Sequence, residues 1–152
     1  MPVAKVPSEI PGLIAAALAK RLDLDPVHLE HAIANADAEH QEALMAAFTQ
    51  LGVRYRRNAS RPGYGFDCSG LTTYAWGEAD VELPRQSRAQ INAAATRSFA
   101  NAQAGDLVYY PGHVMLWLGV GRAIVHSPRP GRRVEVSTAR ARRRIRVGDP
   151  TA

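Results

Sequence analysis

The stretch from residue 106 to residue 127 reads DLVYYPGHVMLWLGVGRAIVHS. It contains three runs rich in Val, Ile, Leu and aromatic residues, and Pro-Gly and Gly-Val-Gly separate them, which is the pattern of short strands joined by tight turns. Similar runs follow towards the C-terminus. We therefore expect five strands, over 106–110, 113–118, 122–127, 132–136 and 143–147. Consecutive short strands of this kind predict an antiparallel sheet.

The first fifty residues predict helices. Apolar residues recur at helical spacing over 9–21 and again over 27–51, with a break at 35–37. Ser8 and the Asp25-Pro26 pair are typical of helix starts. The side chains of Ser8 and Asp25 can accept hydrogen bonds from free backbone N–H groups, and proline is tolerated in the first turn.

Two shorter helices are expected between these regions, over 68–78 and 87–95. In the second of them Ser87 and Gln90 have the spacing of a capping box. Residues 54–66 are rich in Arg, Gly and Pro and indicate a loop. Helices followed by an antiparallel sheet indicate an α+β fold.

Length and composition indicate one ordinary globular unit. The chain has 152 residues, of which 46% are hydrophobic and 22% charged. Its single cysteine, Cys68, excludes an intramolecular disulfide and a cysteine-based zinc cluster, but it is compatible with a catalytic thiol. The longest early apolar run, over 13–19, is too short for a membrane span, which needs about 20 residues, and its flanks are a poor match for a signal peptide.

The charge of the chain is unevenly distributed. The formal net charge is +5. Residues 1–50 carry three basic and seven acidic residues, whereas residues 129–152 carry eight arginines and two acids, a net of +6. Such a cluster is typical of a solvated face, and it also suits an anionic partner such as an acidic polymer or a membrane surface. Nucleic acid is a further anionic partner that the cluster would suit, but the solvated face is favoured over it.

Cys68 lies where a predicted helix begins, in the segment Phe66-Asp67-Cys68-Ser69-Gly70-Leu71. If Asp67 caps the helix, the thiol lies in the first turn, where unpaired N–H groups and the helix dipole favour a thiolate. This position predicts a nucleophile. The alternative is a small buried hydrophobic residue, which is a common role of an unpaired cysteine.

Two histidines are the candidate partners of the thiol. If 119 faces 122 across a two-residue turn, then 126 faces 115 and 113 faces 128. His113 and His126 are then diagonal neighbours on one face of a strand pair, within reach of each other. The opposite face receives apolar residues, namely Val114, Leu116, Leu118, Ala123 and Val125.

A thiol and two imidazoles suit a nucleophile, a general base and a residue that orients the base, with His113 as the base and His126 as the orienting residue. Two inert histidines are an alternative. A zinc site with Cys68 is another, although no fourth ligand is evident. His28 and His31 have the spacing of a helical ligand pair, but two exposed histidines are the favoured interpretation.

Six segments, taken together, resemble the NlpC/P60 family of cell-wall cysteine peptidases, in its non-permuted branch. They cover about residues 40–136 and occur in the family's order: Leu51–Tyr55, Phe66–Leu71, Leu83–Ser87 with Gln90, Ala104–Tyr109, Gly112–Val114 with Leu116 and Gly119, and Ile124–Pro128. One departure is the stretch 56–62, where many relatives have a short aromatic-Gly-Gly segment. The resemblance implies a papain-like α+β fold without a metal or cofactor.

The resemblance also implies roles for particular residues. Cys68 would be the nucleophile, His113 the general base and His126 the third polar residue. Substrate contacts are implied for Tyr55, near the oxyanion, for Asp67 and Ser69, near the free amino end of a stem peptide, and for Arg85 and Ser87. The implied reaction is hydrolysis of the bond between γ-D-glutamate and diaminopimelate or lysine in peptidoglycan.

Other expectations follow from this family. The partners would be peptidoglycan stem peptides and anionic wall polymers, and the location would be secreted or in the cell envelope; the sequence indicates no particular immunity or inhibitor protein. Residues 1–36 would form a helical extension that packs on a catalytic domain, 37–152, as a cap or partial plug. A thiol amidase or acyltransferase acting on another amide, and a non-catalytic wall-binding module, are the alternative functions.

Overall fold

Three helices form the N-terminal third of the described chain: α1 (Glu9–Leu22), α2 (Pro26–Ala34) and α3 (Ala38–Phe48). The computed structural model describes residues 9–141 and 144–152, so the expected cap at Ser8 lies outside the described residues. Asp25 caps α2 as predicted, since its side chain accepts from the Val27 N–H at 2.9 Å. The break at 35–37 separates α2 from α3.

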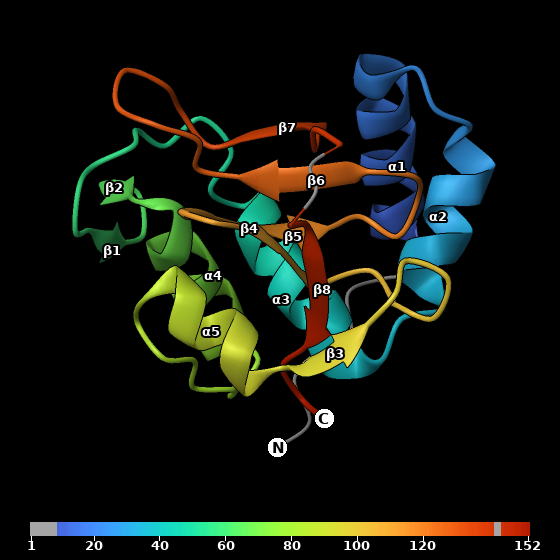
Figure 1. Ribbon diagram of the computed structural model, residues 1–152. Coiled ribbons are helices and arrows are strands. Elements are labelled where there is room, and N and C mark those ends of the chain that lie inside the picture. The colour runs from blue at the N-terminus through green and yellow to red at the C-terminus, as the bar shows by residue number, and fades with distance from the viewer. Residues whose placement is uncertain (1–8, 142–143) are drawn as a thin grey trace.

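A six-stranded antiparallel sheet forms the C-terminal half (Figure 1), in the order β3-β8-β4-β5-β6-β7. A separate two-stranded ribbon, β1 and β2, lies within the predicted loop 54–66. The fold is α+β, as expected. The strand bounds are β1 (Ser60–Arg61), β2 (Gly65–Phe66), β3 (Ala95–Arg97), β4 (Leu107–Tyr110), β5 (His113–Trp117), β6 (Ala123–His126), β7 (Glu135–Thr138) and β8 (Arg146–Asp149).

The two C-terminal strands begin later than predicted. β7 was expected from residue 132, but the Val134 N–H donates to the Val53 carbonyl at 2.8 Å and the Val134 carbonyl accepts from Gly52 at 2.9 Å. The segment before β7 is thus paired with the loop after α3 rather than with β6. β8 begins at Arg146, where pairing with β4 begins. Arg142 and Arg143 lie outside the described residues.

The β5–β6 register is the predicted one. Leu116 pairs with Val125, and Trp117 pairs with Ile124. The five apolar residues expected on one face belong to the main buried cluster, together with residues of α3 and α4. The other face is also covered: it carries Met115 and Trp117, which pack in a second buried cluster.

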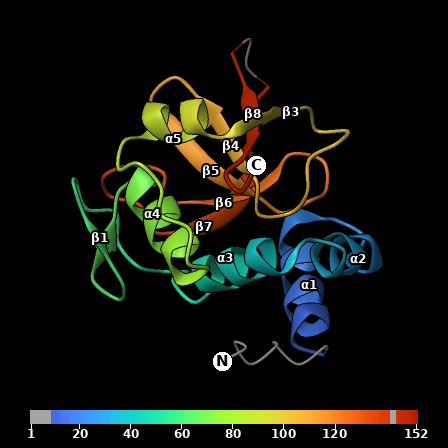
Figure 2. The same cartoon turned by 90° about the horizontal axis from the view of Figure 1, so that it is seen from below.

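Two further helices, α4 (Cys68–Glu78) and α5 (Ser87–Ala93), lie beside the sheet on the side away from α1 and α2 (Figures 1 and 2). The predicted capping box of α5 is wrong. Gln86 is the N-cap residue, without a side-chain capping bond. The Gln90 side chain is instead buried and binds Thr72 Oγ1 at 2.6 Å, because it packs against α4.

The N-terminal helices share the core of the sheet. Leu18 of α1 and Leu29 and Ile33 of α2 are buried in the same cluster as residues of β4–β6. The sequence of α1 predicts a buried apolar stripe made of Ile10, Leu13, Ile14, Ala17, Leu18 and Leu22. This prediction is partly wrong, because Ala17 is exposed while Ala15 and Ala19 are buried. The other members of the stripe are Leu22, which is half-buried, and Ile10, Leu13 and Ile14, whose side chains lie outside the described residues.

In the described part of the chain, no helix is both long and apolar enough to cross a membrane. His28 and His31 are both exposed on α2.

Candidate functional site

Cys68 begins α4, and the local sequence explains why. Asp67 caps the helix by accepting from the Gly70 N–H at 2.7 Å. Gly70 is required because a Cβ there would lie 2.0 Å from the Ala59 carbonyl oxygen. The first turn of α4 is thereby pressed against the chain leading into β1, and Cys68 is presented at its tip.

The Cys68 thiol lies against the backbone on both sides of His113. It can donate to the Gly112 carbonyl at 4.0 Å, and the Val114 N–H donates to the sulfur. Gly112 has a φ of +88°, which suits glycine and shapes the turn into β5. The structure thus brings together Cys68 and His113, which are far apart in the sequence.

The expected lowering of the Cys68 pKa by the helix start does not prevail. N–H donors from Val114 and Ser69 and the charge of Arg85 do favour the thiolate. Burial opposes them and is the largest cause, with the Asp67 carboxylate adding to it, so the pKa of the thiol is raised. A neutral thiol that needs a base follows from this balance.

His113 and His126 are in direct contact. His113 Nε2 lies 2.7 Å from His126 Nδ1, and the ring centroids are 5.0 Å apart. His113 is buried at the start of β5, and His126 ends β6. Burial, together with the nearby Arg132, lowers the pKa of His126 to about 4. His126 is therefore neutral at neutral pH and can orient its neighbour without adding charge.

Tyr55 lies near enough to Cys68 for their charges to interact. Its pKa is raised, first by burial and then by Cys68 and Asp67, two groups whose negative charge disfavours a phenolate. Its backbone N–H donates to the Arg132 carbonyl at 3.0 Å. The tyrosine is thereby fixed between the loop before β7 and the start of α4.

Asp67, Ser69 and Arg85 form a hydrogen-bonded group next to the thiol. Arg85 binds both Asp67 carboxylate oxygens at 3.0 Å and the Ser69 hydroxyl at 2.7 Å. Arg85 also reaches the Ala59 carbonyl at 3.2 Å. The charges of the group are mutually neutralised, which suits a polar subsite of defined shape. Ser87 is half-buried in the first turn of α5, and the structure gives it no role in this group.

A cavity of about 420 Å³ opens beside the two histidines. Tyr110, Pro111 and residues of β5–β7 line it. Its charged lining is mostly basic and consists of Arg129, Arg132, Glu135 and Arg140. An anionic group would find donors here within reach of His113 and His126.

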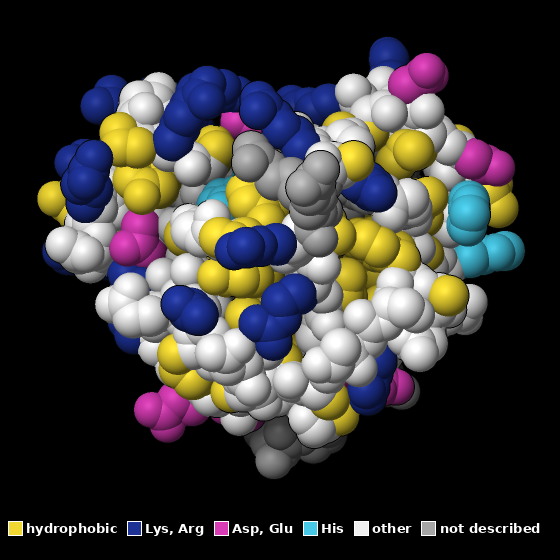
Figure 3. Space-filling view, viewed as in Figure 1, with side chains coloured by type: hydrophobic (Ala, Val, Ile, Leu, Met, Phe, Trp, Pro, Cys, Tyr) yellow, Lys and Arg dark blue, Asp and Glu magenta, His cyan; other side chains and the backbone are white. Residues whose placement is uncertain are grey.

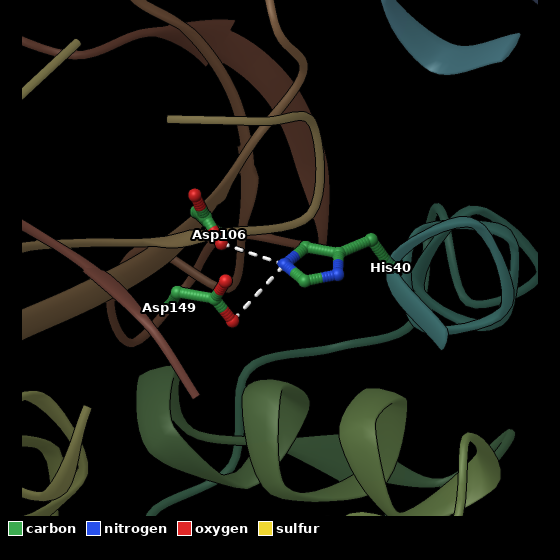
Figure 4. Close-up of side chains that lie close together, drawn as sticks. All are labelled: His40, Asp106 and Asp149. Atoms are coloured by element: carbon green, nitrogen blue, oxygen red, sulfur yellow. Dashed lines mark hydrogen bonds and ion pairs between the residues drawn. The ribbon is translucent and has the colours of Figure 1, made fainter. Parts of the chain in front are cut away.

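A second polar cluster, which the sequence did not indicate, lies in the core. His40 of α3 directs Nε2 to Asp106 at 2.7 Å and to Asp149 at 3.3 Å (Figure 4). In the described chain these three form the only group of three or more His, Cys, Asp or Glu residues whose ligand atoms lie within 4.8 Å of one another.

The geometry of this cluster is that of a hydrogen bond rather than a metal site. Ligand atoms about 2.0–2.2 Å from a tetrahedral zinc ion lie more than 3 Å apart, so the shorter contact would have to open. A ligating histidine also normally has a partner on its second nitrogen, and His40 Nδ1 is buried without one. The cluster joins α3 to the residue just before β4 and to the end of β8.

The sequence profile of the NlpC/P60 family matches residues 52–144, more than half of the chain. The chain belongs to the NlpC/P60 family. A probable endopeptidase of Corynebacterium glutamicum strain R is 35% identical over 116 residues, which are 74% of this chain and 54% of that protein. The bifunctional muramidase/DL-endopeptidase CwlT of Bacillus subtilis is 34% identical over 91 residues, 55% of this chain and 28% of that protein. The chain thus spans about half or less of these NlpC/P60 relatives.

Solved NlpC/P60 structures include both hydrolases and binding proteins. The peptidoglycan hydrolase RipB of Mycobacterium tuberculosis superposes with a TM-score of 0.65 at 26% identity, covering 94% of this chain and 80% of that chain. RipD of the same organism, described as a non-catalytic NlpC/p60 domain protein adapted to peptidoglycan binding, has a TM-score of 0.61 at 25% identity, covering 74% and 98%.

Proposed function

We propose that this protein is a peptidoglycan endopeptidase that hydrolyses the bond between γ-D-glutamate and a diamino acid, with Cys68 as the nucleophile. One observation carries the proposal: the Cys68 thiol lies against the residues on both sides of His113, and the His113 ring is bonded to His126. A thiol, a base and an orienting residue are thereby assembled from α4, β5 and β6.

The raised pKa of Cys68 determines the first step. His113 removes the thiol proton as the sulfur attacks the scissile carbonyl. The backbone N–H of Cys68 is in the first turn of α4, without an acceptor within the helix, and stabilises the oxyanion beside Tyr55. His113 then protonates the departing amine. Water hydrolyses the thioester, with His113 again acting as the base.

The substrate enters with its two ends on different sides of the thiol. The Asp67–Ser69–Arg85 group would bind the free amino end of the stem peptide, through Asp67 and Ser69. The leaving amine must face His113, so the diamino acid occupies the basic cavity beside that residue. Arginines there favour diaminopimelate, because its side chain ends in a carboxylate that lysine lacks.

The proposed location and organisation follow from this substrate. An enzyme acting on stem peptides works in the cell envelope or outside the cell. Residues 1–36 would be a helical extension of the catalytic domain, 37–152. Its packing on the far side of the core from α4 (Figure 2) favours a stabilising role over a plug in the site.

Mass spectrometry of sacculi and of stem peptides incubated with the protein tests the proposal. We expect fragments cut after D-glutamate, faster from diaminopimelate peptides than from lysine peptides. Cys68→Ala should abolish cleavage while retaining the fold, because it removes the nucleophile and little packing. Binding to sacculi without any cleavage would contradict the proposal and favour a wall-binding module. Release of a different amide product would favour the amidase or acyltransferase alternative.

A further inference from the structure

Glu135 is the cross-strand partner of His126. The two residues pair directly between β6 and β7, and Glu135 Oε2 lies 3.9 Å from His126 Nε2. The other ring nitrogen, Nδ1, lies 2.7 Å from His113 Nε2. His126 therefore stands between His113 and a carboxylate, with one ring nitrogen directed to each.

The position of the single proton on neutral His126 links these two contacts. With the proton on Nε2, the N–H faces the Glu135 carboxylate, and Nδ1 accepts a hydrogen bond from His113. With the proton on Nδ1, the lone pair of Nε2 faces the carboxylate, which is repulsive. The carboxylate thus favours the Nε2–H tautomer, directly or through a bridging water.

The tautomer of His126 decides the tautomer of His113. Nε2 of His113 is engaged with His126, so Nδ1 is the nitrogen that would take the Cys68 proton. When His126 accepts, the His113 proton is on Nε2 and its Nδ1 presents a lone pair. When His126 donates, the proton of a neutral His113 is on Nδ1, and His113 cannot act as the base.

We propose that Glu135 is a positioning residue that holds His126 in its Nε2–H tautomer and thereby holds His113 ready to accept the Cys68 proton. This inference rests on the proposed thiol mechanism. Arg132 also contributes to this arrangement, because it binds Glu135 at 2.7 Å. A carboxylate alone would favour the imidazolium form of His126, which would donate to His113 from Nδ1, and the guanidinium opposes that charging.

The surroundings of His126 single out Glu135. The titratable and charged groups that line the same cavity are Tyr110, His113, Arg129, Arg132, Glu135 and Arg140. Among the described residues that line this cavity, Glu135 is the only acid. Its side chain is 27% exposed and that of His126 13%, so the interaction is only partly screened by solvent.

Two measurements that need no substrate test this inference. Nitrogen-15 NMR of the histidine rings reports the tautomer of His126 directly. Alkylation by iodoacetamide reports the readiness of the thiol, and it is specific because Cys68 is the only cysteine. We expect the Nε2–H tautomer in the wild-type protein. Glu135→Gln should convert part of the population to Nδ1–H, slow alkylation at pH 7 by about fivefold, and lower kcat more than KM changes.

Glu78→Gln is the matched control, because it removes the same charge from an exposed position at the far end of α4. It should leave the His126 tautomer, the alkylation rate and kcat unchanged. An Nδ1–H tautomer in the wild-type protein would overturn the inference, as would unaltered tautomers and alkylation in folded Glu135→Gln. If that variant does not fold, the His126 tautomer measured in the wild-type protein still tests the inference. If stem peptides are not cleaved at all, the proposed function is wrong. The NMR and alkylation results test the positioning role of Glu135 separately.

Discussion

Burial is the largest influence on the pKa of both Cys68 and His126. Burial raises the pKa of Cys68 and lowers that of His126, so it favours the neutral form of both side chains. The proposed reaction therefore starts from a neutral thiol and a neutral His126 ring, and the thiol proton moves to His113 only when the sulfur attacks. His126→Gln should leave partial activity, whereas His113→Ala should be nearly as damaging as Cys68→Ala, because an orienting residue contributes less than the base.

Arg132→Gln should move the acid limb of the pH–kcat profile to higher pH. Arg132 is the second cause, after burial, of the lowered His126 pKa, so its removal should raise that pKa by about one unit. Protonated His126 would donate to His113 and disable the base, so kcat at pH 5 should fall further than kcat at pH 7.5. An NMR titration of His126 measures the shift directly, and an unchanged midpoint would contradict this explanation.

The same pKa has a consequence for stability. The His126 pKa of about 4 in the folded protein is below its ordinary 6.5. Between these values the unfolded chain binds more protons than the folded one, so this residue makes stability rise with pH across that window and level off above it. Arg132→Gln should make the rise smaller.

At the scale of elements, the first turn of α4 depends on one close approach. A Cβ on Gly70 would meet the Ala59 carbonyl, whereas a Cβ on Gly77 in the same helix would meet nothing within 4 Å. Gly70→Ala should lower the free energy of unfolding by about 3 kcal/mol and shift Cys68 enough to reduce kcat about tenfold or more. Gly77→Ala should instead raise the free energy of unfolding by about 0.5–1 kcal/mol. Urea unfolding and peptide assays compare the two; equal effects would contradict the steric explanation.

The His40 cluster joins a helix to two strands. His40→Leu would leave Asp106 and Asp149 buried without the imidazole between them, and we expect a loss of about 3 kcal/mol. The folded fraction should keep its activity, since none of the three lines the cavity beside His113. His31→Leu, at an exposed position, should change stability by no more than about 0.5 kcal/mol. If the purified wild-type protein contains zinc and the His40→Leu variant does not, that result would contradict the hydrogen-bonded interpretation.

At the scale of the whole molecule, the uneven charge of the sequence is visible on the molecular surface. Lys and Arg side chains gather over β7 with its preceding loop and across the centre of the face in Figure 3. A second cavity, of about 430 Å³, has Arg88, Arg144 and Arg146 in its lining. We propose that this surface concentrates the enzyme on anionic wall polymers by attraction that salt screens over about 10 Å at 0.1 M.

The double variant Arg88→Gln and Arg144→Gln should weaken binding to sacculi about threefold at low salt, with a smaller effect at high salt. Cleavage of a short soluble stem peptide should be unchanged, because neither arginine lines the cavity beside His113. Lys20→Gln with Arg21→Gln removes the same charge from exposed positions on α1 and is the matched control. Equal weakening by both pairs would show that only net charge matters.

The sequence by itself determined the order of the five helices and of strands β4 to β8, the cap of α4 and the β5–β6 register, because these depend on local spacing and a tight turn. It also identified the three residues proposed for catalysis. It did not indicate the short strands β1, β2 and β3. Only the tertiary structure decided the start of β7, because residues 132–134 pair with the loop after α3, a segment far away in the sequence, and not with β6. It likewise decided the contact of Glu135 with His126, the His40 cluster and the raised pKa of Cys68. These depend on burial and on residues distant in sequence, which local patterns do not encode.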